Sequence, residues 1–190
     1  MYRTATEQCA EGAITVELTI EKSASPDDAR QVEAFLLREA RLLDSECWDE
    51  WLLTLSEGIH YWMPGIENRR REDKSGPYTL EHMAFFDDSL RDLKRRVARF
   101  KQPSAWAENP PTRNVHVISN IEVFAGVEPE EFIAHSCFMN VRSRGLSELA
   151  QIVGRRVDVL RIEVDGLKLL KRKILIPYAM LLCKNINTFL

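Results

Sequence analysis

The feature of this sequence that most constrains its fold is a change of hydrophobic period near Arg113. Before that point apolar residues recur every three to four positions, which is typical of amphipathic helices. After it they alternate with polar residues, which is typical of strands with one buried face. Helices followed by a run of long strands predict an α+β fold, in which a curved antiparallel sheet packs against the N-terminal helices.

Three helices are expected in the first half of the chain. The first begins near Ser25, because serine is a favoured N-cap and Pro26 suits the first helical position. A second, short helix carries Trp48 and Trp51 and is expected to end at 56–58, where a glycine follows. A short strand at 59–63 comes next. Asp87 or Asp88 is expected to cap the third helix.

Four strands are expected in the second half, at 113–123, 132–144, 149–164 and 168–176. Strict alternation in the first of them places Val115 and Val117 on the same face as Ile121 and Val123. Asp165-Gly166 lies between two alternating runs and predicts a hairpin whose two turn residues both take positive φ.

Length and charge limit the classes of protein to consider. The 190 residues, 45% of them hydrophobic, fit an N-terminal arm at 1–24 and a single domain at 25–190. A net charge of −3 argues against an electrostatic nucleic-acid binder. Neither a membrane-spanning run nor a signal peptide is evident, so we expect a cytoplasmic protein. The four cysteines are widely spaced and are expected to be free thiols.

Motifs for phosphate, dinucleotide or metal binding are missing from the sequence. His60, His116 and His135 fall on different expected strands, where a lone polar side chain is the commoner role. A curved sheet covered by helices can also form a conical pocket that holds an acid–base pair. Asp44, His60, His116 and Asp158 are the candidates for such a pair, although Asp158 has arginines beside it with which to pair. With such a pair, the chain would be a free-standing enzyme, such as an isomerase or dehydratase. A second alternative is a module that binds a hydrophobic ligand in the pocket.

Several short strings, in order, resemble the small subunits of aromatic-ring-hydroxylating dioxygenases. They are REARLLD at 38–44 with Trp51, HYWMP at 60–64, WAENPPTR at 106–113 (WxExPPSR in the family), ISN at 118–120, GRRVDVLR at 154–161 (GxRxDxLR), and KRKI at 171–174 with Lys184-Asn185 and Phe189-Leu190. The resemblance runs from about Arg30 to Leu190. The chain departs from the family at Asn114-Val115, Leu167 and Pro177-Tyr178, which puts in doubt the polar contacts of the residues replaced.

This resemblance implies a cone-shaped fold like that of nuclear transport factor 2 (cystatin-like). It implies a non-catalytic structural subunit, trimeric and bound to three large subunits as α3β3. The large subunit is expected to carry a Rieske [2Fe–2S] cluster and mononuclear Fe(II), with electrons from NADH through a reductase and a ferredoxin. The complex adds both atoms of O₂ to an arene and gives a cis-dihydrodiol. Within the family, the sequence resembles the biphenyl, benzene and toluene branch more than the branch that acts on aromatic carboxylates.

The same resemblance implies that this chain carries no catalytic residue, cofactor or metal. Its charge and its lack of a long apolar run predict no nucleic-acid or membrane partner. A small subunit must present a surface to its partners. The candidates for subunit contacts are Trp106, Asn109, Arg113, Arg156, Asp158, Phe189 and Leu190. For the apolar tail that includes the last two, packing inside the chain is an equal alternative.

Overall fold

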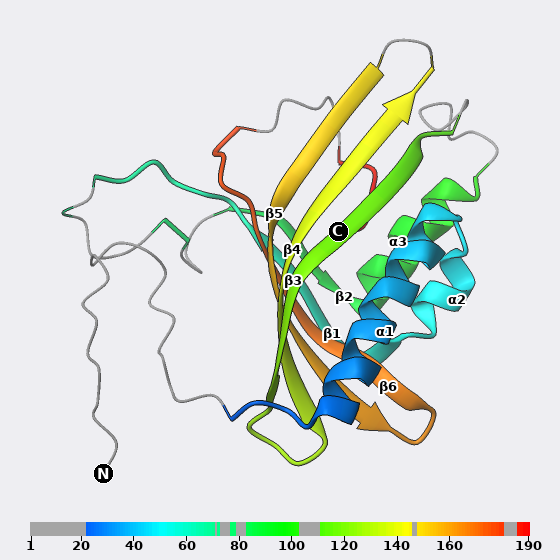
Figure 1. Cartoon of the computed structure of the whole chain (residues 1–190). Helices are drawn as coiled ribbons and strands as arrows, with labels where there is room; N and C mark the ends of the chain where they lie inside the picture. Colours follow the sequence, from blue (N-terminus) through cyan, green and yellow to red (C-terminus); the bar gives the residue numbers. More distant parts are fainter. Residues whose placement is uncertain are drawn as a thin grey trace.

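The computed structural model describes residues 22–70, 72, 77–78, 83–102, 111–145, 148–180 and 186–190. Three helices pack on one face of a six-stranded, strongly twisted sheet (Figure 1). In chain order the elements are α1 (Pro26–Asp44), α2 (Trp48–Leu52), β1 (Leu55–Pro64), β2 (Ala84–Ser89), α3 (Leu90–Phe100), β3 (Arg113–Ala125), β4 (Glu131–Arg144), β5 (Glu148–Glu163) and β6 (Gly166–Leu175). This is the α+β architecture that the change of period predicts.

The strand order is β2-β1-β6-β5-β4-β3. Four of the five neighbouring pairs are antiparallel, but β1 runs parallel to β6. The expectation of a wholly antiparallel sheet is therefore corrected to a mixed sheet. The parallel pair arises because β1 enters the sheet from the helical half of the chain rather than from a hairpin with β6, and a parallel neighbour requires such a long connection.

The first helix begins as predicted. The Ser25 hydroxyl accepts a hydrogen bond from the Asp28 N–H at 3.2 Å, and Pro26 is the first helical residue. Val32, Leu36 and Leu43 lie on the buried side of α1. The helix ends at Asp44, and Glu46 takes a φ of 55° in the turn that leads to α2.

Two boundaries differ from the prediction. The helix α2 ends at Leu52 instead of 56–58, because Leu55 pairs with Leu169 of β6 and the following residues extend β1. Ser89, rather than Asp87 or Asp88, caps α3, in a capping box with Asp92. The two aspartates belong to β2, a strand that the sequence pattern did not reveal.

A bulge in β3 changes which residues face the helices. The register with β4 shifts between Ser119 and Glu122, and Asn120 takes a φ of 51°. Ile121 and Val123 consequently pack against the core, whereas Val115 and Val117 are 56% and 44% exposed. The prediction that these four residues share one face is wrong, since the extra residue reverses the alternation.

The hairpin between β5 and β6 is present at the predicted place, but its turn residues are different. Glu163 pairs with Gly166, so the loop consists of Val164 and Asp165. Gly166 alone of the predicted turn pair has a positive φ, 108°. A second glycine, Gly154, is required by packing, because a Cβ there would meet the Leu175 carbonyl oxygen at 2.5 Å and the Phe138 ring at 2.8 Å.

Of the predicted arm at 1–24, residues 1–21 lie outside the described residues. Ser23 bridges Phe124, and the Ala24 N–H bonds to the Val123 carbonyl, so this short stretch covers the open edge of β3. Cys47 and Cys137 are free thiols, while Cys9 and Cys183 fall outside the described residues. None of the described helices is long and apolar enough to cross a membrane.

Candidate functional site: the interior of the cone

Four charged side chains lie buried between the sheet and α1. Glu39 takes the place of an apolar residue on the buried stripe of α1. Asp158 on β5 and Arg172 on β6 are cross-strand partners in register, and Arg156 precedes Asp158 on the same inward face. None of the four is more than 2% exposed. The strand alternation and the helix period thus direct two cations and two anions into the same interior.

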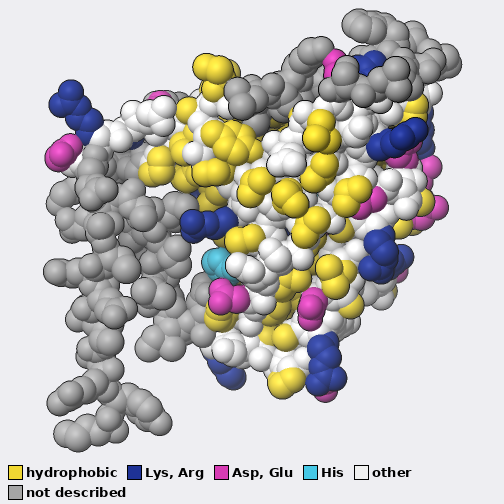
Figure 2. All heavy atoms as spheres, turned by 45° about the horizontal axis from the view of Figure 1, so that its top comes forward, with side chains coloured by type: hydrophobic (Ala, Val, Ile, Leu, Met, Phe, Trp, Pro, Cys, Tyr) yellow, Lys and Arg dark blue, Asp and Glu magenta, His cyan; other side chains and the backbone are white. Residues whose placement is uncertain are grey.

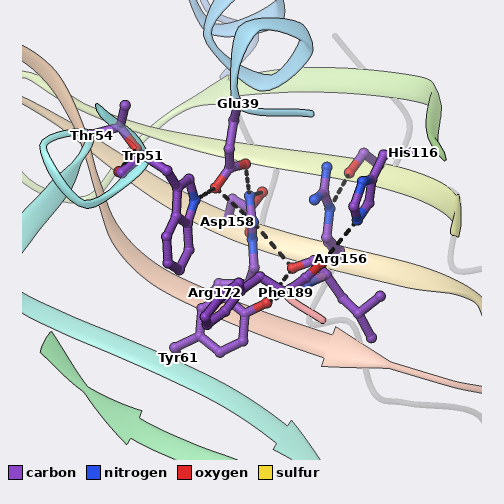
Figure 3. A network of polar contacts seen from close by, with 11 residues as sticks. Glu39, Trp51, Thr54, Tyr61, His116, Arg156, Asp158, Arg172 and Phe189 are labelled. Carbon is purple, nitrogen blue, oxygen red and sulfur yellow. Dashed lines mark hydrogen bonds and ion pairs between the residues drawn. The ribbon is translucent and has the colours of Figure 1, made fainter. Parts of the chain in front are cut away.

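Arg172 is the centre of this group (Figure 3). Its Nε and Nη2 donate to the two oxygens of Asp158 at 2.8 and 2.9 Å. Its Nη1 and Nη2 also donate to the two oxygens of Glu39 at 2.9 and 2.7 Å. The Trp51 indole N–H donates to Glu39 as well, at 3.0 Å. A planar guanidinium suits this doubly bidentate arrangement, which lysine could not make.

The electrostatics follow from this pairing. Burial alone would raise the pKa of Glu39, but the charges of Arg172 and Arg156 outweigh it and hold that pKa below its ordinary value. Burial likewise lowers the pKa of an arginine, yet Asp158 and Glu39 keep the pKa of Arg172 well above the usual value. Both groups therefore stay charged at neutral pH, and neither is a proton donor or acceptor for a reaction.

Arg156 is held more loosely than Arg172. Its Nε donates to the Ser136 hydroxyl at 3.4 Å, and its guanidinium lies 5.8 Å from the centre of the Phe138 ring. Its Nη2 has no hydrogen-bond partner among the described residues. Burial, followed by repulsion from Arg172, lowers its pKa. With Arg156 included, the network around Arg172 has two positive and two negative side chains.

Residues Thr188–Leu190 occupy the space beside this network. The three are 2%, 1% and 0% exposed. The Tyr61 hydroxyl donates to the Leu190 carbonyl oxygen and accepts from the Leu190 N–H, both at 2.5 Å, while Arg172 Nη1 lies 3.1 Å from the same oxygen. Residues 188–190, which we call the tail segment, therefore pack inside the cone, directly against the ionic network.

An Asp–His pair connects α1, β3 and this tail. His116 Nδ1 lies 2.6 Å from Asp44 Oδ1, and the His116 backbone N–H lies 3.1 Å from both carboxylate oxygens. The other ring nitrogen, Nε2, is 2.8 Å from the Phe189 carbonyl oxygen and 3.0 Å from Asn140 Nδ2. The His116 side chain is 1% exposed. Both ring nitrogens thus face protein atoms, and neither faces open space.

The outer face of the same sheet has the opposite character. Val115, Val117, Leu149 and Val153 are between 43% and 67% exposed, and we call them the outer aliphatic patch. Val117 and Val153 both pair with Met139, so they lie in one row across three strands. Figure 2 shows hydrophobic side chains reaching the surface over a wide part of the molecule.

Comparisons with known proteins identify the family. Residues 38–182 match the model of the ring-hydroxylating beta subunit. The chain is 33% identical to the biphenyl 2,3-dioxygenase subunit beta of Rhodococcus jostii, over 95% of this chain and 98% of that protein. It is 32% identical to the benzene 1,2-dioxygenase subunit beta of Pseudomonas putida, over 87% of this chain and 90% of that protein.

This chain belongs to the ring-hydroxylating beta subunit family. A solved structure of naphthalene 1,2-dioxygenase with indole bound in its active site contains a similar chain, with a TM-score of 0.81, 23% identity and 88% coverage of both chains. That likeness shows the fold, which is the expected cone of the nuclear transport factor 2 type. The resemblance read from the sequence is confirmed.

The candidate acid–base residues of this beta subunit come together only in part. Asp44 and His116 meet, whereas His60 pairs with Asp87 at 2.7 Å on an exposed site. Asp158 binds Arg172 rather than the arginines beside it in the sequence. His135 packs edge-on against Phe124 on the other face of β4. Among the described residues, no three His, Cys, Asp or Glu side chains are placed to hold a metal ion.

The seven residues expected to contact other subunits differ in exposure, and two of them are not described by the structure. Arg113 is exposed at the start of β3. Arg156, Asp158, Phe189 and Leu190 are buried within the chain. Trp106 and Asn109 lie outside the described residues.

Sequence reasoning missed Glu39, Arg172, Trp51 and Tyr61 as parts of one polar site. A signal existed for Glu39, because it lies three residues after Leu36 and four before Leu43, on the apolar stripe of α1. Alternation in β5 similarly placed Arg156 and Asp158 between the inward residues Ile152 and Leu160. The partner of Asp158 could not be assigned without the register between β5 and β6.

Proposed function

We propose that this beta subunit is a non-catalytic, structural part of the terminal oxygenase of an aromatic-ring dioxygenase in the cytoplasm. The observation that carries the proposal is the filled interior of the cone. An enzyme of this fold needs an open pocket with a titratable group facing the substrate. Here Arg172 pairs with both Glu39 and Asp158, Arg156 supplies the second positive charge beside them, and Phe189 and Leu190 occupy the neighbouring space.

The relatives named for biphenyl and benzene dioxygenases support the reaction that we propose for the complex. The assembled enzyme incorporates both atoms of O₂ into an arene of this kind and yields a cis-dihydrodiol. Electrons come from NADH through a reductase and a ferredoxin. The Rieske cluster and the mononuclear iron, which supply electron transfer and O₂ activation, are held by the large subunit. The beta subunit contributes a rigid support for that subunit.

The contact surface of the beta subunit is its outer side, and three such subunits join three large ones. Exposed aliphatic residues in a contiguous row are typical of surfaces that a partner covers. The outer aliphatic patch has this character. Arg113 lies on the same strand as Val115 and Val117, and Trp106 and Asn109 precede it in the sequence. These residues are the first to test for contacts with other subunits.

Of the candidate acid–base residues, Asp44 and His116 come together and so favour the alternative of an acid–base enzyme. In such a pair the carboxylate orients the imidazole, and the other ring nitrogen must reach the substrate. In this chain that nitrogen lies 2.8 Å from the Phe189 carbonyl. We therefore assign the pair a structural role, in which it holds the tail segment between α1 and β3.

The proposal is tested by co-expressing the tagged chain with its large subunit. Native mass spectrometry is expected to give three copies of each, and iron analysis of the separated subunits to find the metal with the larger one. Asp44→Asn and His116→Gln should leave dioxygenase turnover per iron within about twofold of the parent. A lone oligomer of this chain that turns over a cyclic substrate, and loses that activity with His116→Gln, would favour the isomerase or dehydratase.

A further inference from the structure

The ring of Phe189 has the surroundings of a bound ligand. Four side chains from two helices enclose it: Trp48 and Trp51 of α2, and Arg96 and Phe100 of α3. The ring centres of Trp51, Trp48 and Phe100 lie 4.2, 5.6 and 5.9 Å from that of Phe189. Arg96 Cζ lies 4.5 Å from the ring centre, within the range of a cation–π contact.

The geometry of these neighbours is that of an aryl site. Trp48 and Phe100 stack on each other at 5.2 Å, with 16° between their planes, and both meet Phe189 by its edge. Edge-to-face contact is one of the two arrangements that aromatic pairs prefer. The pocket walls therefore support one another independently of the ring that fills them.

Side chains from three further elements and from α3 contact the backbone beside this ring. Arg96 Nη2 donates to the Thr188 carbonyl at 2.7 Å, and Tyr61 and Arg172 hold the Leu190 carbonyl. His116 Nε2 lies 2.8 Å from the carbonyl of Phe189 itself. Three successive carbonyl oxygens thus each meet a different side chain, although Thr188–Leu190 forms no strand or helix. An extended peptide bound in a groove is recognised in the same way.

We propose that the cone of this subunit contains a binding site for a small neutral arene, and that Phe189 occupies it as an internal ligand. The inference does not depend on the proposed function. A free arene of about the size of toluene binds wherever the Phe189 side chain is absent or withdrawn. Three of its four named walls are aromatic rings that are already in place, the fourth is the Arg96 guanidinium, and apolar cavities are known to take up benzene.

The experiment uses the full chain with Phe189→Ala. The three carbonyl contacts involve the backbone and remain, so the change removes the ring without releasing the tail segment. Toluene is then titrated, and thermal melting and the fluorescence of the tryptophans that line the site are recorded. We expect saturable one-to-one binding that raises Tm by about 3–6 °C at ten times Kd, with no such rise in the parent chain.

Phe138→Ala is the matched control, because Phe138 is also buried, at 2% exposure, but its one ring partner among the described residues is the Arg156 guanidinium, 5.8 Å away. Its toluene-dependent rise in Tm should be at least three times smaller. An equal rise in both variants, or no saturable binding by Phe189→Ala up to the solubility limit of toluene, overturns the proposal. If Phe189→Ala does not fold, Phe189→Leu reports the same quantity with a smaller cavity.

Discussion

The two faces of the sheet reverse the usual distribution of polar and apolar side chains. The inner face buries Glu39 of α1 with Asp158 and Arg172, while the outer face leaves Val117 and Val153 in contact with solvent. Buried charges are tolerated inside because each has partners at hydrogen-bond distance. Aliphatic side chains outside have no such compensation within the chain. The contacts of Glu39, Asp158 and Arg172 are thus made within the single subunit, whereas the exposed valines are left for a partner to cover if one binds there.

This difference separates stability from assembly. Changes to the inner face should unfold the chain, because they leave a charge without its partner. Changes to the outer face should leave the chain folded and affect only what it binds. Substitutions on the two faces test that separation, because their expected losses of stability range from large on the inner face to small on the outer face.

Arg172→Met should have the largest effect. It leaves Glu39 and Asp158 buried without a cation in contact, and breaking a buried ion pair from one side costs about 3–5 kcal/mol of unfolding free energy. Urea denaturation of the full chain measures the loss. Arg161→Met is the control: Arg161 is 41% exposed in its pair with Glu131, and such pairs contribute about 1 kcal/mol or less. Similar losses in the two variants would show that the buried network does not stabilise the fold.

Glu39→Gln should have a smaller effect that depends on pH. At pH 7 the change weakens charged hydrogen bonds to Arg172, at a cost of about 1.5–3 kcal/mol. The pKa of Glu39 is lowered in the folded chain, so its contribution is present above the ordinary value of 4.5 and is lost as the pH falls through the folded pKa. The stability of the parent should therefore fall below about pH 4.5 more steeply than that of the variant.

Unfolding curves between pH 3 and pH 7 measure this difference. Glu33→Gln, on the exposed side of the same helix, is the matched control and should follow the parent. Parallel profiles for the parent and Glu39→Gln would mean that Glu39 is not held ionised by Arg172.

Local patterns in the sequence contain the direction of several inner-face side chains, although Glu39 was not recognised from them, but these patterns do not contain the ion-pair partners. The helical period of α1 and the alternation of β5 indicate that Glu39, Arg156 and Asp158 point inward, and the N-cap at Ser25 is where the residue types place it. Which arginine neutralises Asp158 depends on the register of β5 with β6, a long-range property that no local pattern contains. The strand β2 was missed for a similar reason, because its pairing with β1 outweighs the capping preference of its two aspartates.

The direction of Val115 and Val117 was predicted wrongly because of one extra residue in β3. Strict alternation assigned Val115 and Val117 to the core, and the bulge at Ser119–Glu122 reverses that assignment. Asn120 offers a weak signal, since asparagine tolerates positive φ better than most residues, but asparagine is common elsewhere too. The outer aliphatic patch therefore became visible only with the strand register.

Asn120→Ala tests the bulge and should have a modest effect. At a φ of 51°, alanine carries a steric cost that glycine does not, so the loss is about 1 kcal/mol for alanine and near zero or a slight gain for Asn120→Gly. Urea denaturation of the two variants separates the cost of the backbone conformation from the loss of the side chain. Equal losses would instead assign the role of Asn120 to its amide group.

Val117→Glu should have the smallest effect on the chain itself and a large one on assembly. Val117 is 44% exposed, and surface substitutions usually change the unfolding free energy by about 0.5 kcal/mol or less. In a subunit contact the same carboxylate is desolvated without a partner, which should weaken the association at least tenfold. Val164→Glu is the matched control, because Val164 is fully exposed at the tip of the β5–β6 hairpin, outside the patch.

Native mass spectrometry of the co-expressed subunits distinguishes the partners. If Val117→Glu removes contacts between copies of this chain, pairs of one large and one small subunit remain. If it removes contacts with the large subunit, the small subunit is recovered without it. If Val117→Glu assembles as the parent does, the outer aliphatic patch is not the subunit contact. The segment around Trp106 and Arg113 then becomes the next candidate for that contact. The exposed valines of the outer face would then need no partner subunit to explain them, because the fold of the single chain alone would account for their positions. In this respect the outer face would resemble the inner one.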